Sequence, residues 1–161
     1  MEGLWFIDGI DLYLNFGIVI ETGSADFLKP PPKKESIEHD WRDSNGREVD
    51  LERFFFDQRE GALNMALIGT SEEDFREKLD NFIGHLTKPG LRRFSLKAHG
   101  DRSYYIYYKQ TSNFTALKPL RGSDLDGKVV YKFSILVVEP EPQLNPADTF
   151  LVDEEGRFII T

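Results

Sequence analysis

The chain has 161 residues, with 28 acidic and 20 basic side chains, a formal net charge of −8 at pH 7 and no cysteine. The length suits one domain with a hydrophobic core, and 13 phenylalanines and 6 tyrosines favour a folded protein over a disordered one. The acidic charge argues against general nucleic-acid binding and against adhesion to anionic membranes. The lack of cysteine excludes disulfides, thiolate metal sites and cysteine nucleophiles. Residues 1–8 lack the pattern of a secretory signal, so we expect synthesis in the cytoplasm.

A first hairpin is expected near the N-terminus. Residues 4–7 and 12–20 are rich in β-branched and aromatic side chains, and Asp8-Gly9 supplies a turn signal between them. Both segments are therefore predicted to be strands.

The next segment, residues 22–34, predicts an extended arm or loop. Its three consecutive prolines remove three amide donors and favour a polyproline conformation. A disordered linker is one interpretation, and a projecting arm that meets a neighbouring molecule is the other. Residues 36–41 and 48–56 then flank Asn45-Gly46, which accepts the backbone angles of a tight turn, and they predict a second hairpin.

The clearest single element is a helix over residues 70–86. Thr70 followed by Glu73 matches a capping box, and Pro89-Gly90 ends the segment. The apolar residues of this segment share one helix face: Phe75, Leu79, Phe82, Ile83 and Leu86. This face is expected to cover a β-sheet.

Strands are expected on both sides of this helix. Residues 62–68 precede it, and four strands follow it at residues 93–98, 103–109, 114–117 and 128–138. Together these patterns predict an α+β, mainly β fold, a β-sandwich or split barrel with one flanking helix. We expect one domain over residues 1–142 and a C-terminal extension, with a short hairpin, over residues 143–161.

No catalytic, cofactor-binding or metal site is predicted. The three histidines, His39, His85 and His99, lie far apart in the sequence and lack the spacing of metal ligands. Residues 124–127 place two aspartates before a glycine, but the remaining ligands of a calcium loop are missing. No serine lies in a nucleophile-elbow context.

An aromatic strand, residues 104–108, has two possible roles. Strand alternation puts Tyr105 and Tyr107 on the face opposite Tyr104, Ile106 and Tyr108, so one face belongs to the core. The other face is either a subunit interface or a stacking platform for a sugar or for single-stranded nucleic acid, and the acidic charge of the chain argues against the nucleic acid.

The order of these features resembles the N-terminal, ring-forming domain of siphophage distal tail proteins and, more loosely, the phage tail-tube fold. The resemblance covers residues 4–142. It depends on the Ile-Asp-Gly-Ile-Asp-Leu segment at residues 7–12, the Lys-Pro-Gly-Leu junction at residues 88–91, and a last strand that exits at residues 138–140.

The resemblance implies a structural phage tail or baseplate component of the virion. In that family, copies form a hexameric ring through which DNA passes as non-specific cargo, in contact with other tail proteins, with no enzyme activity and no cofactor. Because no second domain follows Pro142, a plain ring component is expected rather than a receptor-binding one. The candidates for a subunit interface are Phe27, Leu28, Pro30, Pro31, Pro32, Phe55, Tyr105 and Tyr107. The alternative is a small carbohydrate-binding β-sandwich module.

Overall fold

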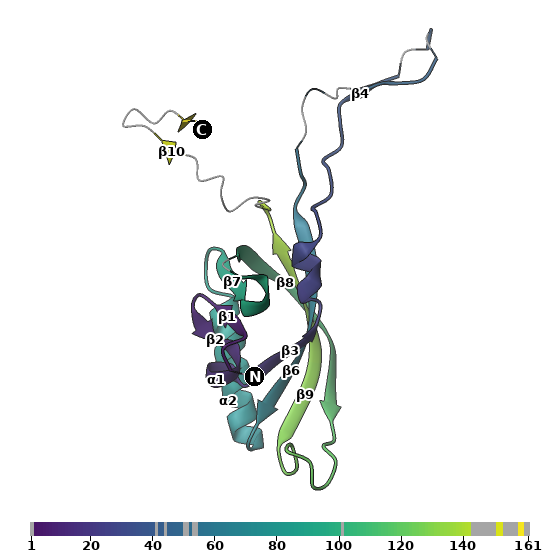
Figure 1. Cartoon of the computed structure of the whole chain (residues 1–161). Helices are drawn as coiled ribbons and strands as arrows, with labels where there is room; N and C mark the ends of the chain where they lie inside the picture. The colour runs from purple at the N-terminus through teal and green to yellow at the C-terminus, as the bar shows by residue number, and fades with distance from the viewer. Residues whose placement is uncertain are drawn as a thin grey trace.

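Seven strands form one antiparallel sheet in the order β2-β1-β7-β8-β9-β6-β3 (Figure 1). The structure is a computed structural model that describes residues 2–40, 42–43, 45–49, 52, 55–100, 102–142, 151–152 and 158–159. The strands of the sheet are β1 (Trp5–Ile7), β2 (Ile10–Asp11), β3 (Ile18–Thr22), β6 (Arg59–Gly69), β7 (Arg92–Leu96), β8 (Ser103–Leu117) and β9 (Val129–Glu139). The helices are α1 (Leu12–Phe16), α2 (Glu72–Leu86) and the 3-10 turns η1 (Ser24–Leu28) and η2 (Lys97–His99). The mainly β fold with one substantial helix is confirmed.

Strand β8 belongs to both halves of the sheet. Residues 103–106 of β8 pair with β7, and residues 107–117 pair with β9. The two halves curve around one core, in the manner of a split barrel, and the edges β2 and β3 do not pair with each other. The most deeply buried large side chains come from both halves, from η1 and from the helices: Ile7, Leu12, Ile18, Phe27, Leu63, Leu67, Phe82, Phe94, Ile106, Ile135, Val137 and Val138.

Helix α2 covers the core with the predicted face. Phe75, Phe82 and Leu86 are buried, and Leu79 and Ile83 pack against the core at its margin. The cap lies one residue later than predicted. Ser71, not Thr70, is the N-cap, and its hydroxyl accepts a hydrogen bond from the Asp74 amide. None of the described helices is long and apolar enough to cross a membrane.

The predicted strand over residues 12–20 is wrong in its first part, which forms helix α1. The Asp11 carboxylate caps this helix by accepting hydrogen bonds from the amides of Tyr13 and Leu14. Gly17 ends the helix with φ 64°, a left-handed conformation that glycine adopts without strain. Strand β3 then pairs with β6 instead of returning to β1. The Asp8-Gly9 turn is real, but it joins β1 to the short β2.

Two of the strands predicted after α2 are joined, and the strands predicted at residues 62–68 and 128–138 are present. The separate strands predicted at residues 103–109 and 114–117 are one strand, β8, which bends at two register shifts. Residues 62–68 and 128–138 form β6 and β9, which pair along their whole length.

The segment between η1 and β6 projects from the body as an arm, which we define by its described residues, 29–40, 42–43, 45–49, 52 and 55–58 (Figure 1). Its two legs pair near the base, where the Lys34 amide donates to the Phe55 carbonyl and the Asp57 amide donates to the Pro32 carbonyl. Farther out, β4 (Glu38–His39) pairs with β5 (Glu48–Val49), so the second hairpin is present. Position 41 of its first predicted strand and positions 50, 51, 53 and 54 of its second lie outside the described residues.

The backbone of the C-terminal extension is described only in part. Strand β10 (Leu151–Val152) pairs with β11 (Phe158–Ile159). Residues 143–150, 153–157 and 160–161 of this extension lie outside the described residues. The division of the chain at residue 142 stays a prediction.

We expect Phe82→Ala to lower the free energy of unfolding by about 3–5 kcal/mol, because Phe82 is 1% exposed and its ring packs 5.6 Å from that of Phe16. Denaturant unfolding measures this loss. Arg76→Ala, an exposed position on the same helix, is the control and is expected to change stability by about 0.5 kcal/mol or less. A similar, small effect of both substitutions would contradict the role of α2 as a core lid.

Candidate assembly surfaces

The longest unpaired strand edge in the described sheet lies on β8. Beyond Ile106, β8 has β9 on one side and no strand on the other. Residues 112–117 are all exposed, and they include Phe114 at 47% and Leu117 at 40% exposure. A strand edge of this kind presents free amide and carbonyl groups to another chain.

Strand β3 provides a second open edge on the far side of the same half-sheet. It pairs only with β6, through Ile18↔Leu67 to Thr22↔Asn64. The half-sheet β8-β9-β6-β3 therefore has four strands and an open edge at each end. Strands added at these two edges would extend the sheet in both directions.

The outer face of this half-sheet carries small and paired polar side chains. Asn64 accepts a hydrogen bond from Ser134 and donates one to Thr22, with the Asn64–Thr22 distance 2.7 Å. Lys109 pairs with Glu60 at 2.6 Å, and Lys132 pairs with Glu21 at 2.7 Å. These ion pairs are half exposed, and their charges largely neutralise each other on this face.

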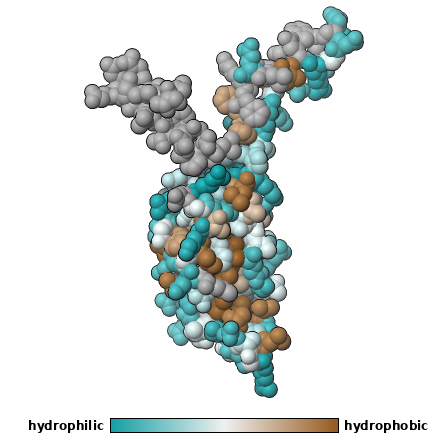
Figure 2. Space-filling model, in the orientation of Figure 1, coloured by the Kyte–Doolittle hydropathy of each residue, from teal (hydrophilic) through white to brown (hydrophobic). Residues whose placement is uncertain are grey.

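Among its described residues, the arm carries exposed apolar side chains. Ile37 is 67% exposed, Phe55 is 63% exposed and Val49 is 36% exposed. Figure 2 shows hydrophobic side chains both at the base of the arm and farther along it. At the base, residues of both legs line an open groove of about 560 Å³, among them Lys29, Pro32 and Asp57.

The predicted interface residues fall into two groups. Leu28, Phe55, Tyr105 and Tyr107 are apolar or aromatic and at least 39% exposed, and Pro30 and Pro32 are exposed as well. Pro31 and Phe27 are buried within the chain itself.

Phe27 is therefore corrected from an interface residue to a core residue. It is 1% exposed, and its ring centroid lies 4.9 Å from that of Tyr104 and 5.6 Å from that of Phe94. Gly61 makes room for the ring, because a Cβ atom there would lie 3.0 Å from Phe27. Phe27 thus anchors the start of the arm to the core, and its side chain is not available to a neighbour.

The tyrosine strand alternates as predicted. Tyr104 and Ile106 are buried, whereas Tyr105 and Tyr107 are 44% and 39% exposed on the opposite face. Tyr105 lies opposite Arg93 of β7, and Tyr107 lies opposite Val138 of β9. This face is available either to a neighbouring subunit or to a small ligand.

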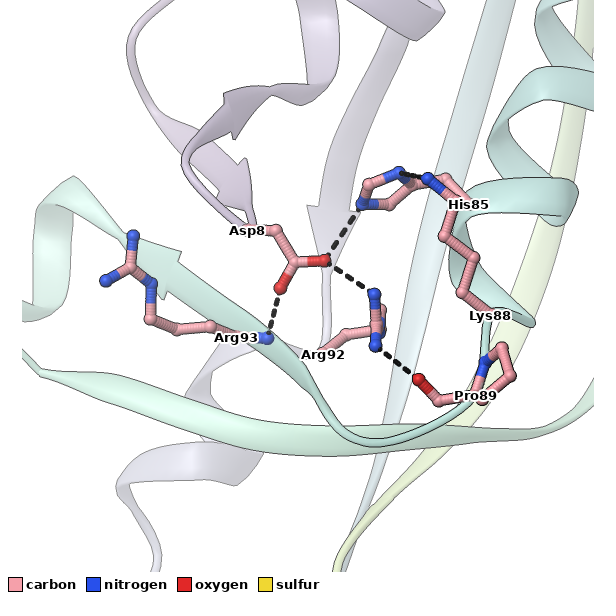
Figure 3. Close-up of polar contacts among 6 residues, drawn as sticks. All are labelled: Asp8, His85, Lys88, Pro89, Arg92 and Arg93. Atoms are coloured by element: carbon pink, nitrogen blue, oxygen red, sulfur yellow. Dashed lines mark hydrogen bonds and ion pairs between the residues drawn. The ribbon is translucent and has the colours of Figure 1, made fainter.

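A polar cluster joins the β1–β2 turn to the end of α2 and the start of β7 (Figure 3). One Asp8 oxygen lies 2.9 Å from His85 Nε2 and accepts a 3.1 Å hydrogen bond from Arg92. The other accepts a 2.8 Å hydrogen bond from the Arg93 amide. Lys88 Nζ lies 3.3 Å from His85 Nδ1. An ammonium group can only donate, so Nδ1 accepts, and Nε2 carries the proton that faces Asp8.

We interpret this cluster as a structural clamp. Both carboxylate oxygens of Asp8 and both ring nitrogens of His85 are already engaged, so neither group is free to serve a substrate. Partial burial raises the pKa of Asp8, but the Arg93 amide, His85 and Arg92 outweigh it, and the pKa lies below its usual value of 3.8. The histidine was expected to be structural, but its partner in the turn could not be found from the sequence.

The other candidates for chemistry have structural partners. His99 Nδ1 lies 2.9 Å from the Tyr104 hydroxyl, and Asp126 accepts a hydrogen bond from the Gly122 amide within its own turn. The side chain of His39 is outside the described part of the structure. Within that part, no three histidine, aspartate or glutamate side chains are grouped so that they could hold a metal ion.

Comparison with known proteins finds similarity in structure only. The sequence matches no protein-family model and no curated protein. Among solved structures, it is similar to the SPP1 Dit (gp 19.1) protein, described as a paradigm of the hub adsorption apparatus in phages that infect Gram-positive bacteria. The TM-score is 0.61 at 15% sequence identity, over 86% of this chain and 50% of the SPP1 chain.

The chain has the fold of the matched half of the SPP1 Dit chain. The resemblance to distal tail proteins is thereby confirmed for the fold. The chain spans about half the length of the SPP1 Dit chain, so the similarity covers only part of that protein.

We expect Asp8→Asn to destabilise the protein at about pH 7 by about 1.5–3 kcal/mol, the range for hydrogen bonds to a charged group. The pKa of Asp8 is lower in the folded state, so its contribution is present above the usual value of 3.8 and is lost as the pH falls below it. The difference in unfolding free energy between wild type and variant is therefore expected to shrink in acid. Asp80→Asn, at an exposed position on α2, is the control. An equal difference at about pH 7 and about pH 3 would contradict the clamp.

Proposed function

We propose that the protein is a structural component of a phage tail or baseplate that self-assembles into a ring forming part of the DNA conduit. The observation that carries this proposal is the four-stranded half-sheet with an open edge at each end, β3 and the second part of β8. The fold shared with the SPP1 Dit protein supports the same role. The protein would then act by assembly, without enzyme activity or a cofactor, and would function in the virion.

A ring follows if β3 of one copy pairs with β8 of the next. The two edges are different surfaces, so the contact is head-to-tail, and such contacts close into a ring when the rotation between copies allows it. The half-sheets would then form one continuous sheet around the lumen. Six copies are expected from the resemblance to distal tail proteins.

The arm supports the same assembly. It extends away from the body, and its exposed Ile37, Val49 and Phe55 have no cover within the described chain. Contact with an adjacent copy or with another tail protein would bury these side chains. Leu28, Pro30 and Pro32 at its base, together with Tyr105 and Tyr107 on β8, are the remaining candidates for that interface.

The charge of the chain suits a conduit for DNA. A net charge of −8 repels the phosphate backbone, so DNA would pass without being held. DNA is therefore cargo and not a specific ligand in this proposal.

A carbohydrate-binding module is the second candidate, because Tyr105 and Tyr107 expose aromatic surface on one face. This candidate predicts a stable monomer at high concentration, and a change in tyrosine fluorescence when sugars are added. The ring proposal predicts neither result.

Chemical cross-linking between introduced cysteines tests the ring directly, since the chain has no cysteine of its own. We expect the double variant Glu21→Cys, Ser112→Cys, with one cysteine near each open edge, to form a ladder of covalent oligomers with a short bismaleimide. The ladder would end at one closed species, and electron microscopy would show rings.

The single variants are the matched controls. With Glu21→Cys or Ser112→Cys alone, each contact between β3 and β8 contains only one thiol. Each single variant is therefore expected to give few covalent oligomers. Equal cross-linking of a single variant, or none in the double variant at a concentration where rings are visible, would contradict the pairing of β3 with β8.

A further inference from the structure

A buried ion pair lies where the arm meets the body. Arg59 and Glu139 have side chains only 7% and 3% exposed, and Arg59 Nε lies 2.8 Å from Glu139 Oε2. Burial raises the pKa of Glu139, and the adjacent guanidinium opposes that rise. The two residues are opposite each other at the ends of β6 and β9.

The same guanidinium also holds the first leg of the arm. Arg59 Nη1 donates a 2.8 Å hydrogen bond to the carbonyl of Lys29, where the chain leaves η1. Arg59 itself lies at the end of the returning leg, two residues after Asp57. Its guanidinium carbon lies 5.5 Å from the centre of the Tyr104 ring. The Tyr104 ring in turn packs on Phe27, which precedes the arm. One side chain therefore ties both legs of the arm to the core and to the end of β9.

We propose that Arg59 and Glu139 are positioning residues that fix the direction of the arm before a partner binds. A ring protein gains affinity when a long arm is already held in its bound direction, because less ordering is needed on assembly. The effect on assembly rests on the proposed ring function, whereas the effect on the arm itself does not.

Core stability alone does not explain this pair. A buried ion pair stabilises a fold no better than apolar side chains of similar size, because both charges lose their hydration. An apolar pair could not bind the Lys29 carbonyl. The contact that distinguishes Arg59 from an apolar residue is thus the one that reaches the arm.

The test uses Arg59→Met combined with Glu139→Leu, which removes both charges together and fills the space with apolar atoms. Amide hydrogen exchange is measured at Lys34 and Asp57, whose amides pair the two legs of the arm. We expect exchange at these two positions to be about tenfold faster in the double variant, the effect of losing one hydrogen bond from a charged donor. Leu63 and Ile135, paired in the central ladder, report the core and are expected to change much less.

Two further variants sharpen the result. Arg59→Lys keeps the charge beside Glu139 but loses the forked geometry that reaches Lys29, so its arm is expected to exchange at an intermediate rate. Arg76→Gln, at an exposed ion pair on α2, is expected to leave arm exchange unchanged. Unchanged arm exchange in the double variant, or equal acceleration of the arm and the central ladder, would overturn the proposal.

Assembly of the same variants is then compared by the yield of closed rings. A looser arm with fewer rings supports the positioning role in assembly, and a looser arm with an unchanged yield overturns that part. If the wild-type protein forms no rings, the proposed function fails, and the exchange rates still decide whether Arg59 and Glu139 hold the arm.

Discussion

The structure depends on one strand that serves two half-sheets. The first residues of β8 pair with β7 and the later ones pair with β9, so the sheet must curve around the core at that point. Because β7 begins only at Arg92, opposite Ile106, the second part of β8 has one neighbour and an open edge. The register shifts at Tyr108/Gln110 and Ser112/Thr115 bend this part of the strand. Closure of the core and exposure of the edge are therefore consequences of the same pairing.

The core and the proposed assembly surfaces meet at the base of the arm. Phe27 packs on Tyr104 of β8, and Arg59 links Lys29 of the arm to Glu139 of β9. The arm is consequently anchored to two strands of the open half-sheet, β8 and β9. A neighbour that contacts the arm and a strand that pairs at the open edge would thus both bind to elements attached to β8 and β9.

Sequence patterns predicted the elements in which one spacing of apolar residues repeats over many residues. The α2 stripe and the alternation in β9 were evident because many residues repeat one spacing. Helix α1 was missed because its one turn has too few residues for a period, although Asp11 and Gly17 mark its ends. Strand β8 was divided in two because polar residues at an open edge look like a loop. The Arg59–Glu139 contact joins residues 80 positions apart and has no local signal. Phe27 was misplaced because the polar segment around it conceals its burial.

Hydrogen exchange on assembled and dissociated protein tests the central claim most directly. The account predicts that assembly slows exchange at those amides of residues 107–117 in β8 and 18–22 in β3 that face the free edge, because that edge would become paired. The paired central strands β6 and β9 are already protected and would change little. Protection that appears only on the arm or around Tyr105, with both strand edges still exchanging as in the monomer, would contradict it.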